Sequence, residues 1–239
     1  RDLSCPSATS FHVFFPLVSV VHRLMFSRPE HLSQFVQLAG SSVTIDRNSR
    51  GERILLPAGV AIWDPEISTT RIRDSKAYSS HRQRLEAYDF IKEYCPAYGF
   101  GWAELEEIDQ LGMTQANMLA MYRALDSAKI APNYILIDGD KDQFSHFRYT
   151  TPYGEPVSYT TVVKGDNTFL SIAAASIVAK VERDLYIDQL CDDNPGLDLY
   201  GIRSNKGYGS KQHEEALEHW GLTPHHRQSW KIAQKFAKV

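Results

Sequence analysis

A segment of small residues that begins just after Asp166 constrains the fold of this chain more than any other feature. It holds the serines Ser171 and Ser176 and three consecutive alanines at 173–175, set among isoleucine and valine. Small side chains let a helix lie very close to the surface that it covers. The segment therefore predicts a buried helix from about Thr168 to Leu190, with the Asp166 carboxylate fixed at its entrance by the backbone.

A second aspartate follows an apolar run. Residues 134–137 are Tyr, Ile, Leu and Ile, and Asp138 comes directly after them, a pattern typical of a buried strand that ends in a carboxylate. Considered alone, Asp138 fits the cap of a turn better than a ligand. Together with Asp166 it favours a metal site, because carboxylates at adjacent element ends suit a divalent metal that handles phosphate. We expect their oxygens to converge to about 4–6 Å at the edge of the central sheet.

The other periodic segments alternate between strand and helix patterns. Residues 1–42 show no sustained period and are expected to be irregular, so the domain is predicted to span 43–239. Strands interleaved with helices predict an α/β fold with a central mixed sheet flanked by helices, and with further helices at the C-terminus. The expected strands are 43–46, 55–63, 98–103 and 159–164, and the other expected helices are 81–93 (capped by Ser79 or Ser80), 114–128, 211–220 and 228–238.

Composition limits the class of protein. The chain has 239 residues, enough for one domain with a sizeable core. Its three cysteines are scattered without metal-ligand spacing, which favours reduced thiols and a cytoplasmic location. No apolar run reaches the length of about 18 residues that a membrane span needs. The net charge is −3, yet residues 203–239 hold seven Lys and Arg against three Glu, which suits either a phosphate backbone or an ordinary solvated helix face.

Several motifs, in order and at matching spacing, resemble the ribonuclease HII (type 2 ribonuclease H) family from about Val43 to the C-terminus. The resemblance implies a ribonuclease H-like fold and hydrolysis of the RNA strand of RNA–DNA hybrids. It also implies incision on the 5′ side of single ribonucleotides embedded in DNA, by a chain expected to act as a monomer. The matching segments are Asp74–Lys76, Thr114–Met121, Leu136–Gly139, Val163–Asp166, Ser171–Asp184, Asn205–Gly209 with His213, and His225–Ser229.

The resemblance also implies the site residues. Four acids of the family hold two divalent metal ions, Mg²⁺ or Mn²⁺, and three of the four correspond here to Asp46, Asp138 and Asp166. Lys76 and Lys164 are the expected phosphate contacts. Tyr208 matches the tyrosine that packs against the deoxyribose at the RNA–DNA junction, whereas Arg183 is expected to pair with nearby carboxylates. Residues 140–159 form an insertion relative to typical bacterial members.

The first family motif is degenerate. It reads Ile-Asp-Glu-Ala-Gly-Arg-Gly in the family, and residues 45–51 align with it. Asp46 matches, and so do Arg50 and Gly51 of the loop that reads the ribonucleotide 2′-hydroxyl. Arg47 replaces the glutamate ligand, and a guanidinium cannot ligate a cation because it stays protonated and has no acceptor. Ser49 replaces the first glycine of the loop.

Three interpretations of that motif remain open. The chain is an active metal-dependent endoribonuclease, or it is a catalytically impaired protein that binds RNA–DNA hybrids, or residues 1–56 are an altered N-terminal sequence on an otherwise normal enzyme. Glu52 is close enough in sequence to replace the missing ligand, although nothing in the spacing requires it.

Overall fold

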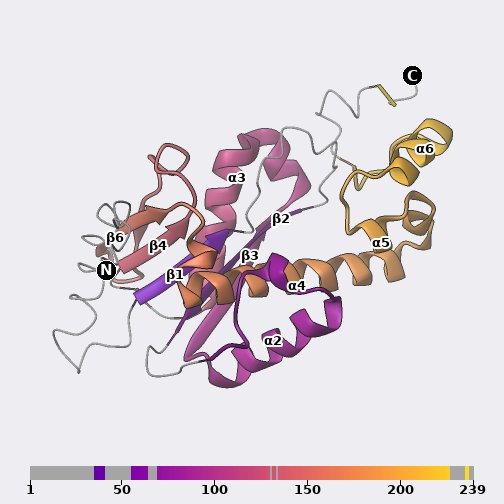
Figure 1. Cartoon of the computed structure of the whole chain (residues 1–239). Helices are drawn as coiled ribbons and strands as arrows, with labels where there is room; N and C mark the ends of the chain where they lie inside the picture. The colour runs from indigo at the N-terminus through magenta and orange to yellow at the C-terminus, as the bar shows by residue number, and fades with distance from the viewer. Residues whose placement is uncertain are drawn as a thin grey trace, which may run out of the picture. The chain divides into compact units, whose positions relative to one another are not determined.

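Six strands form one mixed sheet in the order β3-β2-β1-β4-β6-β5 (Figure 1). The computed structural model describes residues 35–40, 55–63, 69–129, 131–132, 134–226 and 235–236, with 35–40 and 167 described by their backbone alone. β1, β4 and β6 are parallel neighbours, and the other pairs are antiparallel. The strands are β1 (Phe35–Gly40), β2 (Leu56–Ile62), β3 (Ala97–Ala103), β4 (Tyr134–Asp138), β5 (Tyr149–Thr150) and β6 (Pro156–Val162). The predicted α/β class with a mixed sheet is confirmed.

Side-chain capping groups mark the starts of α2 and α3. Ser80 caps α2, as predicted, because its side chain accepts a hydrogen bond from the Gln83 amide. α3 begins earlier than expected, since Glu104 and Glu107 form a capping box, and Gly112 with φ 76° then breaks the helical backbone just before the predicted start. The helices are α2 (His81–Tyr94), α3 (Leu105–Ser127), α4 (Leu170–Asp193), α5 (Ile202–Asn205) and α6 (Lys211–Trp220), with the 3-10 turns η2 (Ser75–Ala77), η3 (Gly165–Asn167) and η4 (Pro195–Tyr200).

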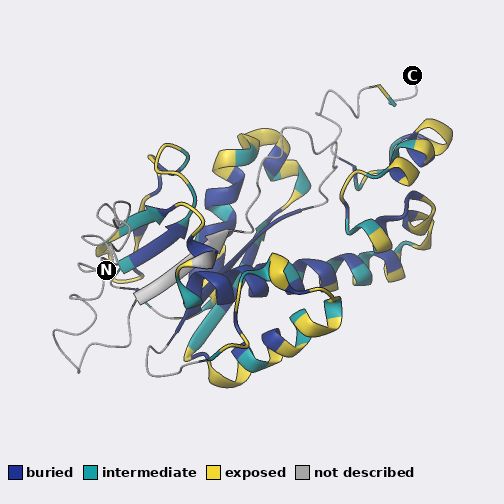
Figure 2. Ribbon diagram, in the orientation of Figure 1, coloured by how far each residue is buried: buried dark blue, intermediate teal, exposed yellow. Residues whose placement is uncertain are grey.

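The two faces of the sheet are covered by different helices (Figure 2). Ala58 and Val60 of β2 belong to a core shared with α3, whereas Ala61 belongs to a core shared with α2 and α4. β4 divides in the same way, with Ile135 and Ile137 in the first core and Leu136 in the second. Both strands are therefore buried on two sides, which explains their nearly continuous apolar sequences.

Glycines in β2 and β3 let the helices approach the sheet backbone. A Cβ atom added at Gly59 would lie 2.1 Å from the Ala175 carbonyl oxygen of α4. One added at Gly101 would lie 2.5 Å from the Ala124 amide nitrogen of α3. The small-residue helix therefore does pack very close to the strand that it covers, as the sequence predicts.

The N-terminal boundary of the domain requires a correction. β1 lies inside the segment 1–42 that was expected to be irregular, and it pairs with both β2 and β4. It is the first strand of the described sheet. The expected strand 43–46 lies outside the described residues, together with the rest of 1–42. β1 carries little sequence signal, because Phe35–Gly40 holds a glutamine and ends in two small residues.

The segment 140–159, which was expected to be an insertion, packs into the core. Phe144 and Phe147 are 1% and 0% exposed and join the core under α3. The Tyr159 hydroxyl donates to the Phe144 carbonyl, and β5 extends the sheet beyond β6. The segment thus widens the sheet beyond β6 and adds two aromatic side chains to the core.

The C-terminal part of the described chain has its own small core. Ile187 and Cys191 of α4 pack with Leu197, Tyr200 and other apolar residues up to α6. The predicted helix 211–220 is confirmed as α6. Most of the expected helix 228–238 falls outside the described residues. Within the described part of the chain, no helix is long and apolar enough to cross a membrane.

Candidate active site

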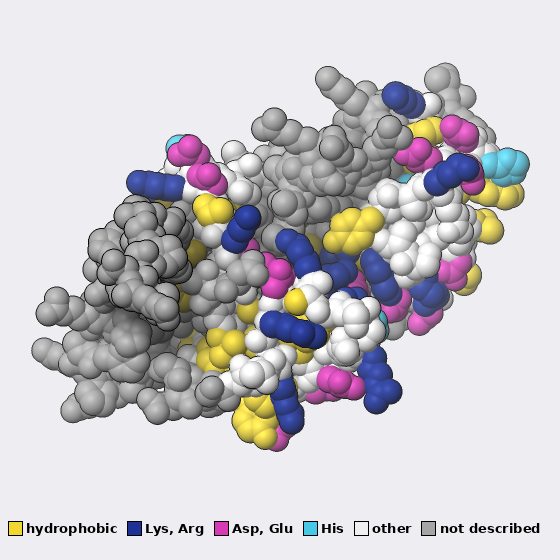
Figure 3. Space-filling view, in the orientation of Figure 1, with side chains coloured by type: hydrophobic (Ala, Val, Ile, Leu, Met, Phe, Trp, Pro, Cys, Tyr) yellow, Lys and Arg dark blue, Asp and Glu magenta, His cyan; other side chains and the backbone are white. Residues whose placement is uncertain are grey.

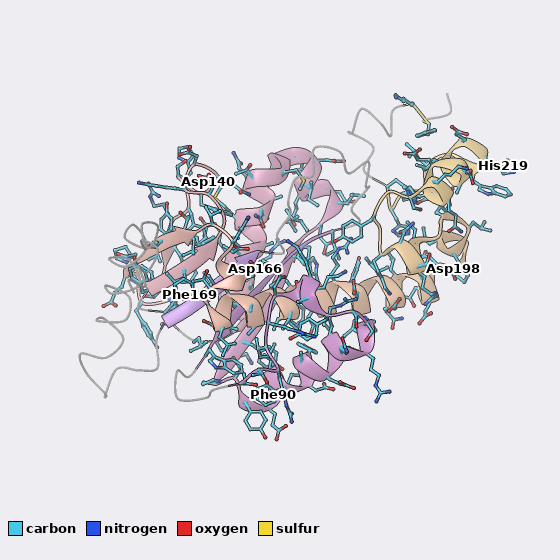
Figure 4. All side chains as sticks on the ribbon, viewed as in Figure 1. Phe90, Asp140, Asp166, Phe169, Asp198 and His219 are labelled. Carbon is cyan, nitrogen blue, oxygen red and sulfur yellow. The ribbon has the colours of Figure 1, made fainter. Side chains whose placement is uncertain are left out.

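The two aspartates predicted as ligands stand at neighbouring element ends. Asp138 is the last residue of β4, and Asp166 lies in η3, the turn that joins β6 to α4 (Figure 4). β4 and β6 are parallel neighbours, so both strands end at the same edge of the sheet. The Gly139 amide donates to the Val162 carbonyl over 3.0 Å, which holds the two exits together.

A direct hydrogen bond joins the Asp138 side chain to the turn that carries Asp166. The Gly165 amide donates to Asp138 Oδ1 over 2.8 Å. A Cβ atom at Gly165 would lie 2.6 Å from Ile172 Cδ1, so a side chain there would require the Ile172 side chain to shift. Lys164 takes a left-handed conformation with φ 56° to complete the turn. The turn therefore depends on the glycine at 165 and on the left-handed backbone of Lys164.

Negative charge is concentrated at this edge of the sheet. Asp166 is only 7% exposed. The pKa of Asp138 is raised above its ordinary value, first by burial and then by the carboxylates of Asp166 and Asp74, while the Gly165 amide and the Lys76 ammonium lower it. The carboxylates of buried Asp166 and half-buried Asp138 repel each other, and a divalent cation bound to these hard oxygen donors would relieve that repulsion. The residues present therefore fit the metal that the sequence predicts.

Replacing Asp138 with asparagine is expected to raise the free energy of unfolding at neutral pH in buffer without divalent metal. The folded chain keeps the Asp138 proton to higher pH than the unfolded chain, so stability falls as pH rises from the ordinary aspartate pKa through the raised folded value. Asparagine has no charge to bury. Thermal unfolding should show a higher melting temperature for Asp138→Asn at pH 7 and a smaller difference in acid.

The control for this comparison is Asp140→Asn. Asp140 is exposed, and its carboxylate accepts a hydrogen bond from the Asp142 amide that asparagine would preserve. The melting temperature of Asp140→Asn should match that of the unmodified chain at both pH values. Equal melting of Asp138→Asn and the unmodified chain at pH 7 would contradict the destabilising charge at residue 138.

The segment Asp74–Lys76 lies beside the two aspartates. Asp74 caps η2 by accepting from the Lys76 amide over 2.9 Å. The hydroxyls of Ser75 and Ser176 are 2.9 Å apart, which ties η2 to the middle of α4. Lys76 was predicted to be near the site. Asp74 was not, although it stands in the same matched segment and its charge acts on Asp138.

Two further predicted site residues, Lys164 and Tyr208, lie in the part of the chain that the structure describes. Lys164 is exposed, and Tyr208 is 40% exposed. Asp46, Arg50 and Gly51 lie outside the described residues. Among the residues that are described, no group of three or more His, Cys, Asp and Glu could hold a metal ion. Of the three acids predicted as ligands, Asp138 and Asp166 are described.

Basic side chains lie near Asp138 and on α4 beside Tyr208. On the face drawn in Figure 3, Lys and Arg side chains gather over α2 and α4. The charge of Lys76 lowers the pKa of the Asp138 carboxyl group. Lys180 and Arg183 of α4 lie beside the ring of Tyr208. A polyanion is attracted to such a surface, and its phosphates partly neutralise the lysines.

Comparisons with known proteins identify the family. A profile of the ribonuclease HII family matches residues 56–233. The chain belongs to the ribonuclease HII family. Ribonuclease HII of Phocaeicola vulgatus is 37% identical over 175 residues, which cover 73% of this chain and 81% of the relative. Ribonuclease HII of Trichormus variabilis is 39% identical over 182 residues, which cover 76% of this chain and 73% of the relative.

Solved structures share the fold of this ribonuclease HII family member. Ribonuclease H2 from Pyrococcus horikoshii OT3 has a TM-score of 0.64 at 24% identity, and the match covers 85% of this chain and 96% of that one. Bst-RNase HIII in complex with Mn²⁺ has a TM-score of 0.62 at 16% identity, covering 87% and 70%. These likenesses confirm the predicted ribonuclease H-like fold.

The family match also separates the two halves of the predicted site. Asp138, Asp166, Lys76 and Tyr208 fall within residues 56–233, the part matched by the ribonuclease HII profile. The degenerate motif at 45–51 precedes it. The match therefore covers the segments around Asp138 and Asp166 and does not extend to residues 45–51.

Proposed function

We propose that this chain is a metal-dependent endoribonuclease that hydrolyses the RNA strand of RNA–DNA hybrids. The proposal includes incision on the 5′ side of ribonucleotides embedded in DNA. The observation that carries it is the hydrogen bond from the Gly165 amide to Asp138 Oδ1, which joins the two acid-bearing segments at one sheet edge. Family membership supplies the substrate class.

Asp138 and Asp166, together with Asp46, would hold two divalent ions, Mg²⁺ or Mn²⁺. Such ions lower the pKa of an attacking water and stabilise negative charge on the scissile phosphate. The raised pKa of Asp138, caused by burial and by the carboxylates of Asp166 and Asp74, supports this assignment. The Gly165 amide donates to Oδ1 of Asp138, which leaves Oδ2 of that carboxylate as the oxygen that would bind an ion.

The remaining predicted residues would hold the nucleic acid. Lys76 and Lys164 would contact backbone phosphates, and Tyr208 would pack against the deoxyribose at the RNA–DNA junction. Arg50 and Gly51 would read the ribonucleotide 2′-hydroxyl. We propose that the chain acts on its duplex as a monomer in the cytoplasm, without a membrane partner.

Cleavage of a labelled hybrid tests the proposal. The unmodified chain should cut the RNA strand of an RNA–DNA hybrid when Mg²⁺ or Mn²⁺ is added, and it should leave an all-DNA duplex of the same sequence intact. Chelation of the ions with EDTA should stop the reaction. Hybrid that stays intact at saturating protein with either ion would overturn the proposed activity.

A second candidate function is hybrid binding with impaired catalysis, and the observation that favours it is Arg47. Replacing a −1 ligand with a +1 group beside two metal ions weakens their binding. On this view Arg47→Glu should raise the single-turnover rate of cleavage at saturating Mn²⁺. A barrier lowered by about 2–4 kcal/mol corresponds to an increase of about 30- to about 1000-fold.

The control variant is Arg47→Gln, which removes the positive charge without adding a carboxylate. If residue 47 occupies a ligand position, glutamine should recover less of the rate than glutamate does. Full activity of the unmodified chain, unchanged by Arg47→Glu, would show that another acid such as Glu52 fills the second ligand position. The second candidate function, hybrid binding with impaired catalysis, would then be rejected.

A further inference from the structure

Tyr208 stands on a tightly built turn. Lys206 and Gly207 both take left-handed conformations, with φ 51° and 73°. The Asn205 side chain accepts from the Gly207 amide over 2.8 Å, and the Asn205 carbonyl accepts from the Tyr208 amide over 3.0 Å. The backbone of Tyr208 is thereby fixed, while its side chain is 40% exposed.

Arg183 of α4 contacts this turn twice. Its guanidinium carbon lies 4.6 Å from the centroid of the Tyr208 ring, within the range of a cation–π contact. Its NH2 group donates a hydrogen bond to the Lys206 carbonyl. The Lys180 ammonium lies 5.6 Å from the same ring centroid. One buried side chain therefore holds both the backbone and the ring of the turn.

Pairing with a carboxylate does not explain why Arg183 is buried. Arg183 is 3% exposed, and burial lowers its pKa while Tyr208 and Asp184 oppose that effect. The Asp184 carboxylate already has Lys180 at 2.7 Å, and the NH1 group of Arg183 is 4.0 Å from it. The expectation that Arg183 pairs with a nearby carboxylate is met by Asp184, but the hydrogen bond from Arg183 to the Lys206 carbonyl shows that it also contacts the turn.

We infer that Arg183 is a positioning residue that holds the Tyr208 ring in the orientation in which it meets the sugar of a bound nucleotide. The inference rests on the proposed function of Tyr208. A half-exposed tyrosine on a fixed backbone still rotates about its side-chain bonds, and binding must stop that rotation at a cost in free energy. The guanidinium of Arg183 restrains the ring already in the free protein, so less freedom is lost when substrate binds.

A double-mutant cycle separates positioning from general support of the fold. Arg183→Lys keeps the charge but loses the planar stack. It should lower kcat/KM for a duplex with one ribonucleotide by about 5- to about 30-fold, the effect of a cation–π contact of about 1–2 kcal/mol. In a Tyr208→Ala background the same change should cost less than about 2-fold.

Two further variants sharpen the cycle. Lys180→Met leaves the hydrogen bond from Arg183 to Lys206 intact, so it should give a smaller loss that also disappears in the Tyr208→Ala background. Lys92→Met is the matched control, because the Lys92 ammonium lies 4.8 Å from the Tyr88 ring in a comparable pair on α2. Its kcat/KM should be unchanged. Equal losses for Arg183→Lys with and without the Tyr208 ring would overturn the inference.

A readout without substrate distinguishes failure of this inference from failure of the proposed activity. With 3-fluorotyrosine at position 208, the fluorine resonance should move toward its solvent-exposed position in Arg183→Lys and stay in place in Lys92→Met. An unmoved resonance in Arg183→Lys would overturn the positioning role even if the chain cleaves hybrids. A moved resonance in a chain that cleaves nothing would reject the activity alone.

Discussion

Replacing Asp166 with asparagine is expected to lower the single-turnover rate of hybrid cleavage by about 1000-fold. Asparagine keeps the size of the side chain but removes the charge that would hold a divalent ion. A bound ion supplies several kcal/mol of charge stabilisation at the scissile phosphate, and about 4 kcal/mol corresponds to about three orders of magnitude in rate. The rate of cleavage at saturating protein and Mn²⁺ measures the effect.

Asp140→Asn is the control for this prediction as well. Asp140 is an exposed acid two residues beyond Asp138, and it lies outside the pair joined through Gly165. Its substitution should leave the rate within about 2-fold of the unmodified chain, as expected for a solvated surface charge. Similar losses in Asp166→Asn and Asp140→Asn would indicate a general loss of surface charge and would contradict a ligand role for Asp166.

Replacing Gly59 with alanine is expected to lower the free energy of unfolding by about 3 kcal/mol or more. The added Cβ atom would lie 2.1 Å from the Ala175 carbonyl oxygen and 2.9 Å from the Ala179 amide nitrogen. Both atoms belong to the backbone of α4, so the clash is relieved only by moving the helix off β2. Thermal unfolding should show a fall in melting temperature of about 6–12 °C.

The matched control is Gly196→Ala. A Cβ atom at Gly196 would have no heavy atom within 4 Å, so this change should alter the melting temperature little. Because α4 begins directly after the turn that carries Asp166, Gly59→Ala should also slow cleavage at temperatures where the chain is still folded. Melting of Gly59→Ala at the same temperature as Gly196→Ala would contradict the close contact between β2 and α4.

The parts of the fold with a strong local pattern were predictable from sequence. The alanines of α4 and the strand glycine Gly59 point to one close contact from both sides. The strand that ends at Asp138 was readable because it is apolar throughout and has a single acid at its tip. In each case the informative pattern lies within a single helix or strand and can be read without knowing which element packs against it.

Other parts depend on groups that are distant in the sequence. β1 is placed by its partners β2 and β4, since Phe35–Gly40 has no alternation of its own. Asp74 acts on Asp138 only after η2 is tied to Ser176 on α4. The contact of Arg183 with Tyr208 joins α4 to a turn beyond η4 and α5. Local propensity carries no information about such contacts.

Cleavage of a DNA duplex that contains one ribonucleotide tests the central claim most directly. The unmodified chain with Mn²⁺ should cut that strand once, on the 5′ side of the ribonucleotide. Asp138→Asn and Asp166→Asn should leave it uncut over the same time, and a duplex without the ribonucleotide should stay intact. Cleavage by both variants at the rate of the unmodified chain would contradict the account, and so would an uncut duplex at saturating unmodified protein.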